Sequence, residues 1–180
     1  KFLYLADIES AIGLAQDLGI GTVQAKERFG LSLVLGGAEV KLLDLTSAYG
    51  VFANDGIKNP TAFIISVQDA QGNILEEFRQ NEERILDEQI TRMITDMLSD
   101  NVSRAPIFGS NSSLYLPDRP VAAKTGTTQD NRDGWLVGYT PSIAVGVWTG
   151  NNDNSPMTRQ GAGISAAGPL WNEFMREALK

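Results

Sequence analysis

Apolar residues near the start of the chain recur every three or four positions, the spacing that places side chains on one face of a helix. Asp7 is a suitable N-cap for this helix, and the Gly-Ile-Gly sequence at 19–21 ends it. The next stretch, residues 26–37, ends in a glycine loop at 36–37. The apolar residues of the expected helix are Ile8, Ile12, Ala15 and Leu18.

The same spacing predicts two helices in the middle of the chain. The first ends at the turn-forming sequence 54–56, and the second begins after Asp87. We interpret the methionines of the second helix as core filling, since flexible thioether side chains suit irregular core gaps. The apolar residues are Leu42, Leu45, Tyr49, Phe52 and Ala53 in the first helix, and Ile90, Met93, Ile94, Met97 and Leu98 in the second.

A last helix is expected over residues 169–179. Proline suits the first turn of a helix, so the helix should begin at Pro169. Trp171 should pack in the core or against a sheet. The side chains expected on the buried face are Leu170, Phe174 and Ala178, together with Trp171.

Two groups of apolar, β-branched runs predict strands. The first group is 61–68 and 74–78, joined by a turn at 69–73 and followed by a charged, solvated connection at 79–84. The second group comprises 121–128, 133–140 and 143–149. Its connections are short, so the three runs should pair in order as antiparallel strands.

The stretches between these elements read as loops. Residues 101–120 carry Pro, Gly, Ser and Asn, and residues 151–163 are polar and rich in glycine. The Asn-Asn-Asp sequence at 151–153 fits a solvated loop better than a cation site. The order of elements indicates an α+β fold in which helices pack on an antiparallel sheet.

Composition narrows the range of functions. The chain has 180 residues, which fits one domain, and 42% of them are hydrophobic, enough for a core. Its net charge is −7 with no basic stripe, which argues against nucleic acid as a partner. There is no cysteine and no histidine. Disulfides, thiolate or histidine metal sites and a Ser-His-Asp triad are therefore excluded.

The candidate chemistry lies in residues 121–128, Val-Ala-Ala-Lys-Thr-Gly-Thr-Thr. A peptide can add to an exposed strand edge through main-chain hydrogen bonds. Gly126 allows a ligand backbone to approach closely, and the hydroxyls of Thr125 and Thr127 can donate to a carboxylate. Lys124 supplies positive charge beside that anion. A Lys-Thr-Gly tripeptide alone is a weak signal, because short motifs occur by chance.

The flanking sequence makes the signal specific. Residues 123–128 are followed by 133–141, Asp-Gly-Trp-Leu-Val-Gly-Tyr-Thr-Pro, and by 145–148, Val-Gly-Val-Trp. Upstream lie 35–40, Leu-Gly-Gly-Ala-Glu-Val, and then 46–49 and 52–56. Together these segments resemble the transpeptidase domain of penicillin-binding proteins, closest to the bifunctional class that also carries a glycosyltransferase. The resemblance covers nearly all of residues 1–180.

The resemblance implies a serine acyl-transferase fold in which helices cover both faces of the sheet. The family uses Ser-x-x-Lys for the nucleophile, Ser-x-Asn for proton transfer and Lys-Thr/Ser-Gly on a strand. Only the third is clearly present, because no serine here has a lysine three residues later. We therefore expect residues 1–180 to be the C-terminal portion of an incomplete domain, with the nucleophile upstream of Lys1.

By resemblance, Lys124 is catalytic, and the backbone N–H of Thr127 forms half of an oxyanion hole. Residues 124–128, including Thr128, bind substrate. Asp133 caps or braces the start of the strand or lines the cleft, and Trp135 lies in the core or in the cleft wall. No metal or cofactor is implied. The implied partners are the peptidoglycan stem peptide, β-lactams and the upstream remainder of the domain, at the extracytoplasmic face of the bacterial cell membrane, anchored by a segment outside this chain.

One triplet matches the Ser-x-Asn motif in sequence. Ser99-Asp100-Asn101 matches the Ser-Asp-Asn of class A β-lactamases, but it lies at the end of a predicted helix. Ser, Asp and Asn are ordinary helix-terminating residues, so we read the match as chance.

Three alternatives remain open on the sequence. The fold serves transpeptidases, D,D-carboxypeptidases and β-lactamases, which differ in whether an amine or water resolves the acyl-enzyme. A catalytically silent binding or scaffold module would retain the fold without the nucleophile. The flanking segments favour transpeptidation.

Overall fold

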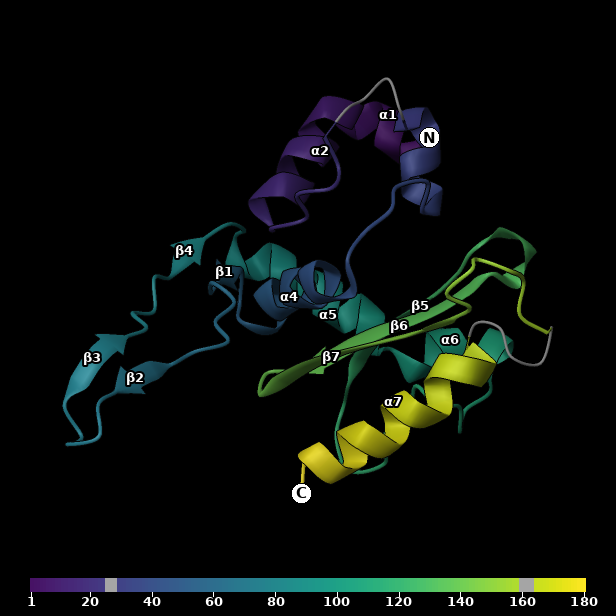
Figure 1. The fold of residues 1–180 in the computed structure, drawn as a ribbon. Helices are drawn as coiled ribbons and strands as arrows, with labels where there is room; N and C mark the ends of the chain where they lie inside the picture. The colour runs from purple at the N-terminus through teal and green to yellow at the C-terminus, as the bar shows by residue number, and fades with distance from the viewer. Residues whose placement is uncertain (25–28, 159–163) are drawn as a thin grey trace.

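The computed structural model describes residues 1–24, 29–158 and 164–180. Within these ranges the chain is α+β, as expected (Figure 1). The predicted stretches 26–37 and 151–163 lie partly outside the described residues. The helices include α1 (Phe2–Ala6), α2 (Ile8–Asp17), η1 (Gly30–Leu35) and η2 (Gln129–Asn131).

The principal sheet has three antiparallel strands in the order β5 (Ala122–Thr127), β6 (Asp133–Thr140) and β7 (Ile143–Gly150). The three predicted strands and their pairing are therefore confirmed. Continuous pairing holds Thr127 opposite Gly134. Strand β5 pairs only with β6 among the described strands, so it is an edge of this sheet.

Helices cover the two faces of this sheet, and two glycines show which helix covers which face. A Cβ on Gly138 of β6 would lie 2.4 Å from the Trp171 ring of α7 (Ile164–Ala178). A Cβ on Gly146 of β7 would lie 2.0 Å from Thr46 Oγ1 of α4 (Leu42–Ala53). Gly146 pairs with Val137, the neighbour of Gly138, so the two glycines face opposite sides.

Helix α7 differs from the prediction in its start and its buried face. It begins at Ile164, so Pro169 lies inside the helix and not in its first turn. The side chains that enter the core are Ala167, Trp171 and Met175, whereas the expected Leu170, Phe174 and Ala178 are exposed. The helix is apolar around much of its girth, so periodicity alone does not select the stripe that meets the sheet. Trp171 packs on the sheet as expected, and its indole N–H donates to the carbonyl of Val145 at 3.0 Å.

A second apolar cluster joins α2 to α4. It includes Ile12, Leu18, Ala48 and Val51, all buried. The predicted boundaries of α2 are confirmed, and the Asp7 carboxylate caps the helix by accepting from the Ser10 amide at 3.1 Å.

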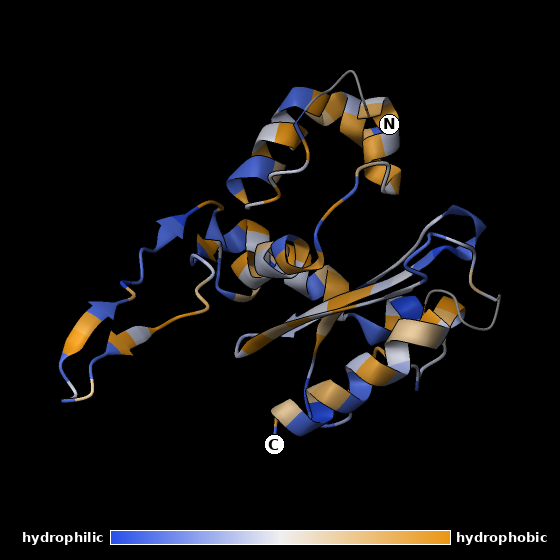
Figure 2. Ribbon diagram, in the orientation of Figure 1, coloured by the Kyte–Doolittle hydropathy of each residue, from blue (hydrophilic) through white to orange (hydrophobic). Residues whose placement is uncertain are grey.

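Strands β2 (Ser66–Gln68) and β3 (Ile74–Glu77) form a hairpin that projects from the body as an arm (Figures 1 and 2). The second predicted strand is confirmed. The first is shorter than the predicted 61–68, because strand pairing begins only at Ser66. The connection 79–84 is exposed as expected, yet its end forms β4 (Glu83–Arg84), which pairs with β1 (Ile57–Lys58).

Helix α5 (Glu88–Ser99) lies where predicted, with Asp87 as its N-cap. The core-filling role of its methionines is wrong, because Met93 and Met97 are 65% and 67% exposed. The helix instead turns Thr91 and Thr95 towards the body: Thr91 is fully buried, and Thr95 shares a 2.8 Å hydrogen bond with the Tyr139 hydroxyl of β6.

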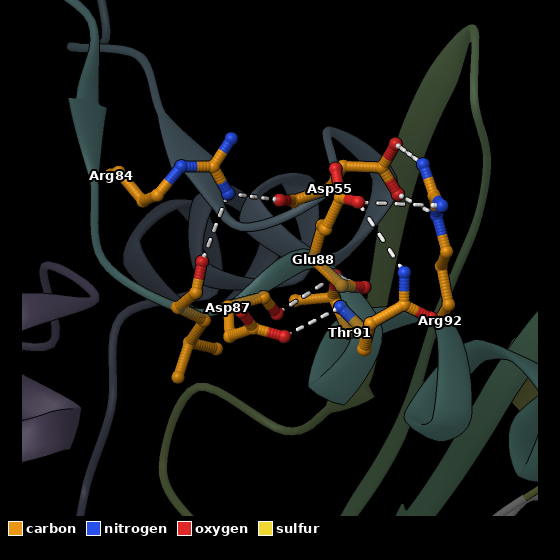
Figure 3. A network of polar contacts seen from close by, with 8 residues as sticks. Asp55, Arg84, Asp87, Glu88, Thr91 and Arg92 are labelled. Atoms are coloured by element: carbon orange, nitrogen blue, oxygen red, sulfur yellow. Dashed lines mark hydrogen bonds and ion pairs between the residues drawn. The ribbon is translucent and has the colours of Figure 1, made fainter.

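Polar contacts attach α5 to the turn after α4 (Figure 3). Arg92 donates two hydrogen bonds to the Asp55 carboxylate, at 3.1 Å and 2.9 Å. Arg84 donates to the carbonyl oxygens of Asp55 and Leu86, at 2.9 Å and 3.2 Å. The Arg92 hydrogen bond and charge hold the pKa of Asp55 below its ordinary value. The turn and the start of α5 are thus fixed to each other.

The predicted loop 101–120 begins with a helix, α6 (Asn101–Phe108). Its Ser, Asn and Pro residues disfavoured a helix, but Asp100 caps it by accepting from the amides of Val102 and Ser103. Half-buried Arg104 then donates to the carbonyl oxygens of Leu98 and Leu114, tying the helix to its surroundings. Tertiary contacts therefore outweigh the weak local helix preference.

Candidate functional site

The Lys-Thr-Gly segment lies on β5, and its exposure changes along the strand. Ala122 and Ala123 are buried beneath the helices, whereas Lys124 and Thr127 are exposed and Thr125 is half-buried. The buried part of the strand thus ends at Ala123, directly before the candidate residues. Their side chains alternate between the two faces, with Lys124 on the face of α4 and the two threonines on the face of α7.

The main chain of the two threonines faces the open edge of β5. The amide of Thr128 donates to the carbonyl of Asp133 at 3.2 Å. Antiparallel pairs alternate between bonded and non-bonded, so the adjacent pair Thr127–Gly134 is non-bonded, as is the pair of Thr125. The N–H and C=O groups of Thr125 and Thr127 therefore point away from β6.

The contact of the Lys124 ammonium agrees with an outward-facing Thr125 carbonyl. Its Nζ donates to the carbonyl oxygen of Thr125 at 2.5 Å. This places the charge beside the open edge, close to the outward-facing donors of the strand.

Gly126 lies opposite Trp135, and a Cβ there would be 3.2 Å from the Trp135 Cβ. Trp135 is half-buried, and its partner in the pairing of β6 with β7 is Trp148. The glycine therefore keeps this side of β5 free of a side chain beside the indole.

The end of β5 is tied to the two neighbouring strands through Asp133. One carboxylate oxygen of Asp133 accepts from the Thr128 hydroxyl at 3.0 Å. The other accepts from the indole N–H of Trp148 at 2.7 Å. This role of Trp148 could not be predicted from local sequence, because only strand pairing brings Asp133 and Trp148 together.

The Ser-Asp-Asn triplet lies at the junction of α5 and α6. The Ser99 hydroxyl donates to the Asp96 carbonyl at 3.2 Å, and Asp100 caps α6. The Ser103 hydrogen bonds lower the pKa of Asp100. Asn101 donates to the Ser110 carbonyl at 2.9 Å. These are the contacts of helix-terminating residues. Ser99 and Asn101 also border a hollow of about 360 Å³ at the start of β5.

Two further properties concern only residues 1–24, 29–158 and 164–180. No helix in these ranges is long and apolar enough to cross a bilayer. No group of three or more acidic side chains in them is placed to hold a metal ion.

Comparison with known proteins gives a consistent result. The family model for the penicillin binding protein transpeptidase domain matches residues 12–176. Penicillin-binding protein 1A of Aquifex aeolicus is 40% identical over 146 residues, which are 81% of this chain and 19% of that protein. Penicillin-binding protein 1A of Neisseria lactamica is 32% identical, over 94% of this chain and 23% of that protein. The chain thus spans about a fifth of these relatives.

Solved structures agree. The penicillin-binding protein PonA1 of Mycobacterium tuberculosis matches 95% of this chain and 49% of its own, with a TM-score of 0.79 and 28% identity. PonA1 in complex with penicillin V matches with a TM-score of 0.78 and 29% identity. The family model, the relatives and the solved structures all point to the same family. The chain belongs to the penicillin-binding protein transpeptidase domain family.

Proposed function

We propose that this chain forms the Lys-Thr-Gly side of a D,D-transpeptidase acyl-transfer site that cross-links peptidoglycan stem peptides and is acylated by β-lactams. The observation that carries the proposal is the open edge of β5, where the main-chain groups of Thr125 and Thr127 face outward beside Lys124. A stem peptide, or the β-lactam that resembles it, adds to this edge as an extra strand.

Each residue of the segment has a distinct role in the proposal. Lys124 matches the negative charge of the ligand and assists proton transfer. The Thr125 hydroxyl donates to the ligand carboxylate, and Gly126 leaves room for its backbone. The N–H of Thr127 is one of two oxyanion donors, and loss of one such donor typically raises the barrier by about 2.7–4 kcal/mol.

The remaining parts of the site lie outside residues 1–180 in this proposal. An upstream segment of the same domain supplies the Ser-x-x-Lys nucleophile and the second oxyanion donor. The complete protein acts at the extracytoplasmic face of the membrane. PonA1 in complex with penicillin V supports the β-lactam part of the proposal, since PonA1 shares the fold of this chain.

A labelled penicillin tests the proposal in two steps. The 180-residue chain alone should form no covalent adduct, because a nucleophilic serine needs a paired base. The same segment together with the upstream part of its domain, in one chain or as a reassembled complex, should be acylated. A stoichiometric, denaturation-resistant label on the chain alone, seen by mass spectrometry, would refute the assignment and direct attention to Ser99.

Substitutions in the complete protein test the roles. Lys124→Ala should slow acylation strongly with little change in melting temperature. Thr125→Val keeps the shape and removes the hydroxyl, so it should weaken ligand binding more than stability. Thr127→Pro should be most harmful, since proline removes the outward-facing N–H that is proposed as an oxyanion donor. Parental acylation by Lys124→Ala would show that Lys124 is only a surface residue.

A further inference from the structure

One carboxylate joins the ends of all three strands of the sheet, next to the proposed oxyanion donor. Asp133 is the first residue of β6. Its Oδ1 accepts from Trp148 Nε1 of β7 at 2.7 Å, and its Oδ2 accepts from the hydroxyl of Thr128, directly after β5, at 3.0 Å. One carboxylate oxygen is therefore occupied by a donor on β7, and the other by a donor on the residue that follows β5.

The Thr128 hydroxyl is occupied as well. It accepts from the main-chain N–H of Asp133 at 2.8 Å while it donates to the carboxylate of the same residue. A hydroxyl carries a single proton, so Thr128 has none left for a ligand carboxylate. Thr128 therefore differs from Thr125, for which no such contact within the described chain uses the proton.

Packing holds this arrangement in place. A Cβ on Gly150, which pairs with Asp133, would lie 2.5 Å from Trp148 Cζ2 and 3.1 Å from Asp133 Oδ1. The indole and the carboxylate thus fill the space that a side chain at position 150 would need. Hydrogen bonds to an ionised carboxylate are about twice as strong as neutral ones, which suits a fixed brace.

We propose that Asp133 is a positioning residue that acts through Thr128 and Trp148 to hold the C-terminal end of β5, and with it the N–H of Thr127, in the orientation needed for acyl transfer. The inference rests on the proposed function. Thr127 directly precedes Thr128, so movement of the brace moves the donor. A displacement of 1 Å from the productive geometry costs on the order of a hundredfold in rate.

The test uses acylation of the complete protein by a fluorescent penicillin, with saturation kinetics that separate the binding constant Kd from the acylation rate constant k2. Asp133→Ala should lower k2 by at least about tenfold, because an oriented donor acts on the transition state more than on the bound ligand. Kd should change less than k2. Trp148→Phe, which retains an aromatic ring and removes one donor, should lower k2 by less.

Thr128 supplies the matched pair of variants. Thr128→Val removes the hydroxyl at nearly constant shape and should lower k2 as Asp133→Ala does, whereas Thr128→Ser should retain most of the parental k2. The double variant Asp133→Ala/Thr128→Val should be little slower than either single variant, since both remove the same contact. Thermal melts of every variant are recorded beside the kinetics.

Several results would overturn the inference. Parental k2 in Asp133→Ala would do so, as would equal k2 in Thr128→Val and Thr128→Ser, or losses of k2 that simply follow melting temperature. If Asp133→Ala does not fold, the two Thr128 variants decide the question. If Lys124→Ala also retains parental acylation, the proposed function fails too. If Lys124→Ala is slow while the Asp133 and Thr128 variants are not, only the positioning role fails.

Discussion

Helices α5 and α7 both pack on the principal sheet, but they are held by different forces. Helix α7 buries Trp171 and Met175 completely. Helix α5 leaves Met93 and Met97 mostly exposed and buries Ile94 and Leu98 only in part. Thr95 and Arg92 form hydrogen bonds to β6 and to the turn after α4.

The contrast shows that helical spacing of apolar residues predicts a helix without predicting what covers it. Burial of large apolar groups holds α7, since it removes apolar area from water. Helix α5 buries less apolar area, and the net contribution of its hydrogen bonds from Thr95 and Arg92 to stability is smaller. Substitutions in the two helices should therefore have unequal effects.

The largest effect is expected for Trp171→Ala. Removal of a fully buried tryptophan should lower the free energy of unfolding by about 3–5 kcal/mol, through lost burial and the remaining cavity. Urea denaturation of the 180-residue chain measures it. Leu170→Ala, at a position that is 58% exposed in the same helix, is the matched control and should cost less than about 1 kcal/mol. Equal losses in the two variants would show that α7 is not held by its buried stripe.

The next effect concerns the hydrogen bond between Thr95 of α5 and Tyr139 of β6. Tyr139→Phe should lower the free energy of unfolding by about 1 kcal/mol. The double variant with Thr95→Val should recover part of that loss, because neither partner is then left unpaired. Additive losses in this cycle would mean that the bond does not couple α5 to the sheet.

The same tyrosine predicts a loss of stability in alkali. Burial raises the pKa of Tyr139 above its ordinary value. Burial also raises the pKa of Tyr49, and the charge of the nearby Tyr139 acts in the same direction. The unfolded chain then loses these protons first, so the contribution of the two tyrosines to stability is constant below about pH 10 and is lost as pH rises through the raised values. Unfolding measured from pH 8 to 11 should show a shallower decline for Tyr139→Phe. An unchanged slope would contradict the role of Tyr139.

A smaller effect is expected for Asp55→Asn, which breaks the contact with Arg92. Both side chains are about half exposed, so the loss should be slight and should vanish in 1 M salt. The contact lowers the pKa of Asp55, so its stabilisation is present above about pH 4 and is lost as pH falls below that value. A melting difference that persists in high salt at neutral pH would indicate a packing effect instead.

The smallest effect is expected for Met93→Gln and Met97→Gln on α5. Both side chains are mainly in water, so each variant should change the free energy of unfolding by less than about 0.5 kcal/mol. Losses above 1 kcal/mol in the 180-residue chain would remove the contrast between the helices. Losses confined to a longer protein would show that another part of that protein covers α5.

Local sequence was sufficient for much of the fold. Helical spacing and the caps Asp7 and Asp87 located α2 and α5, and alternation with short connections gave the three strands and their order. It failed for α6, where the cap of Asp100 and the contacts of Arg104 outweigh an unfavourable composition. It also missed the start of α7, because a proline is tolerated inside a helix that the sheet supports.

The sequence by itself determined the family, the antiparallel order of the strands and the segment 124–128, because motifs and periodicity are properties of neighbouring residues. Only the tertiary structure decided which helix faces are buried, since that depends on what packs against them. It also decided that Thr125 and Thr127 face an open edge, and that Asp133 meets Trp148. Those two residues lie on different strands and are far apart in the sequence. The register of the strands brings the carboxylate and the indole within hydrogen-bonding distance.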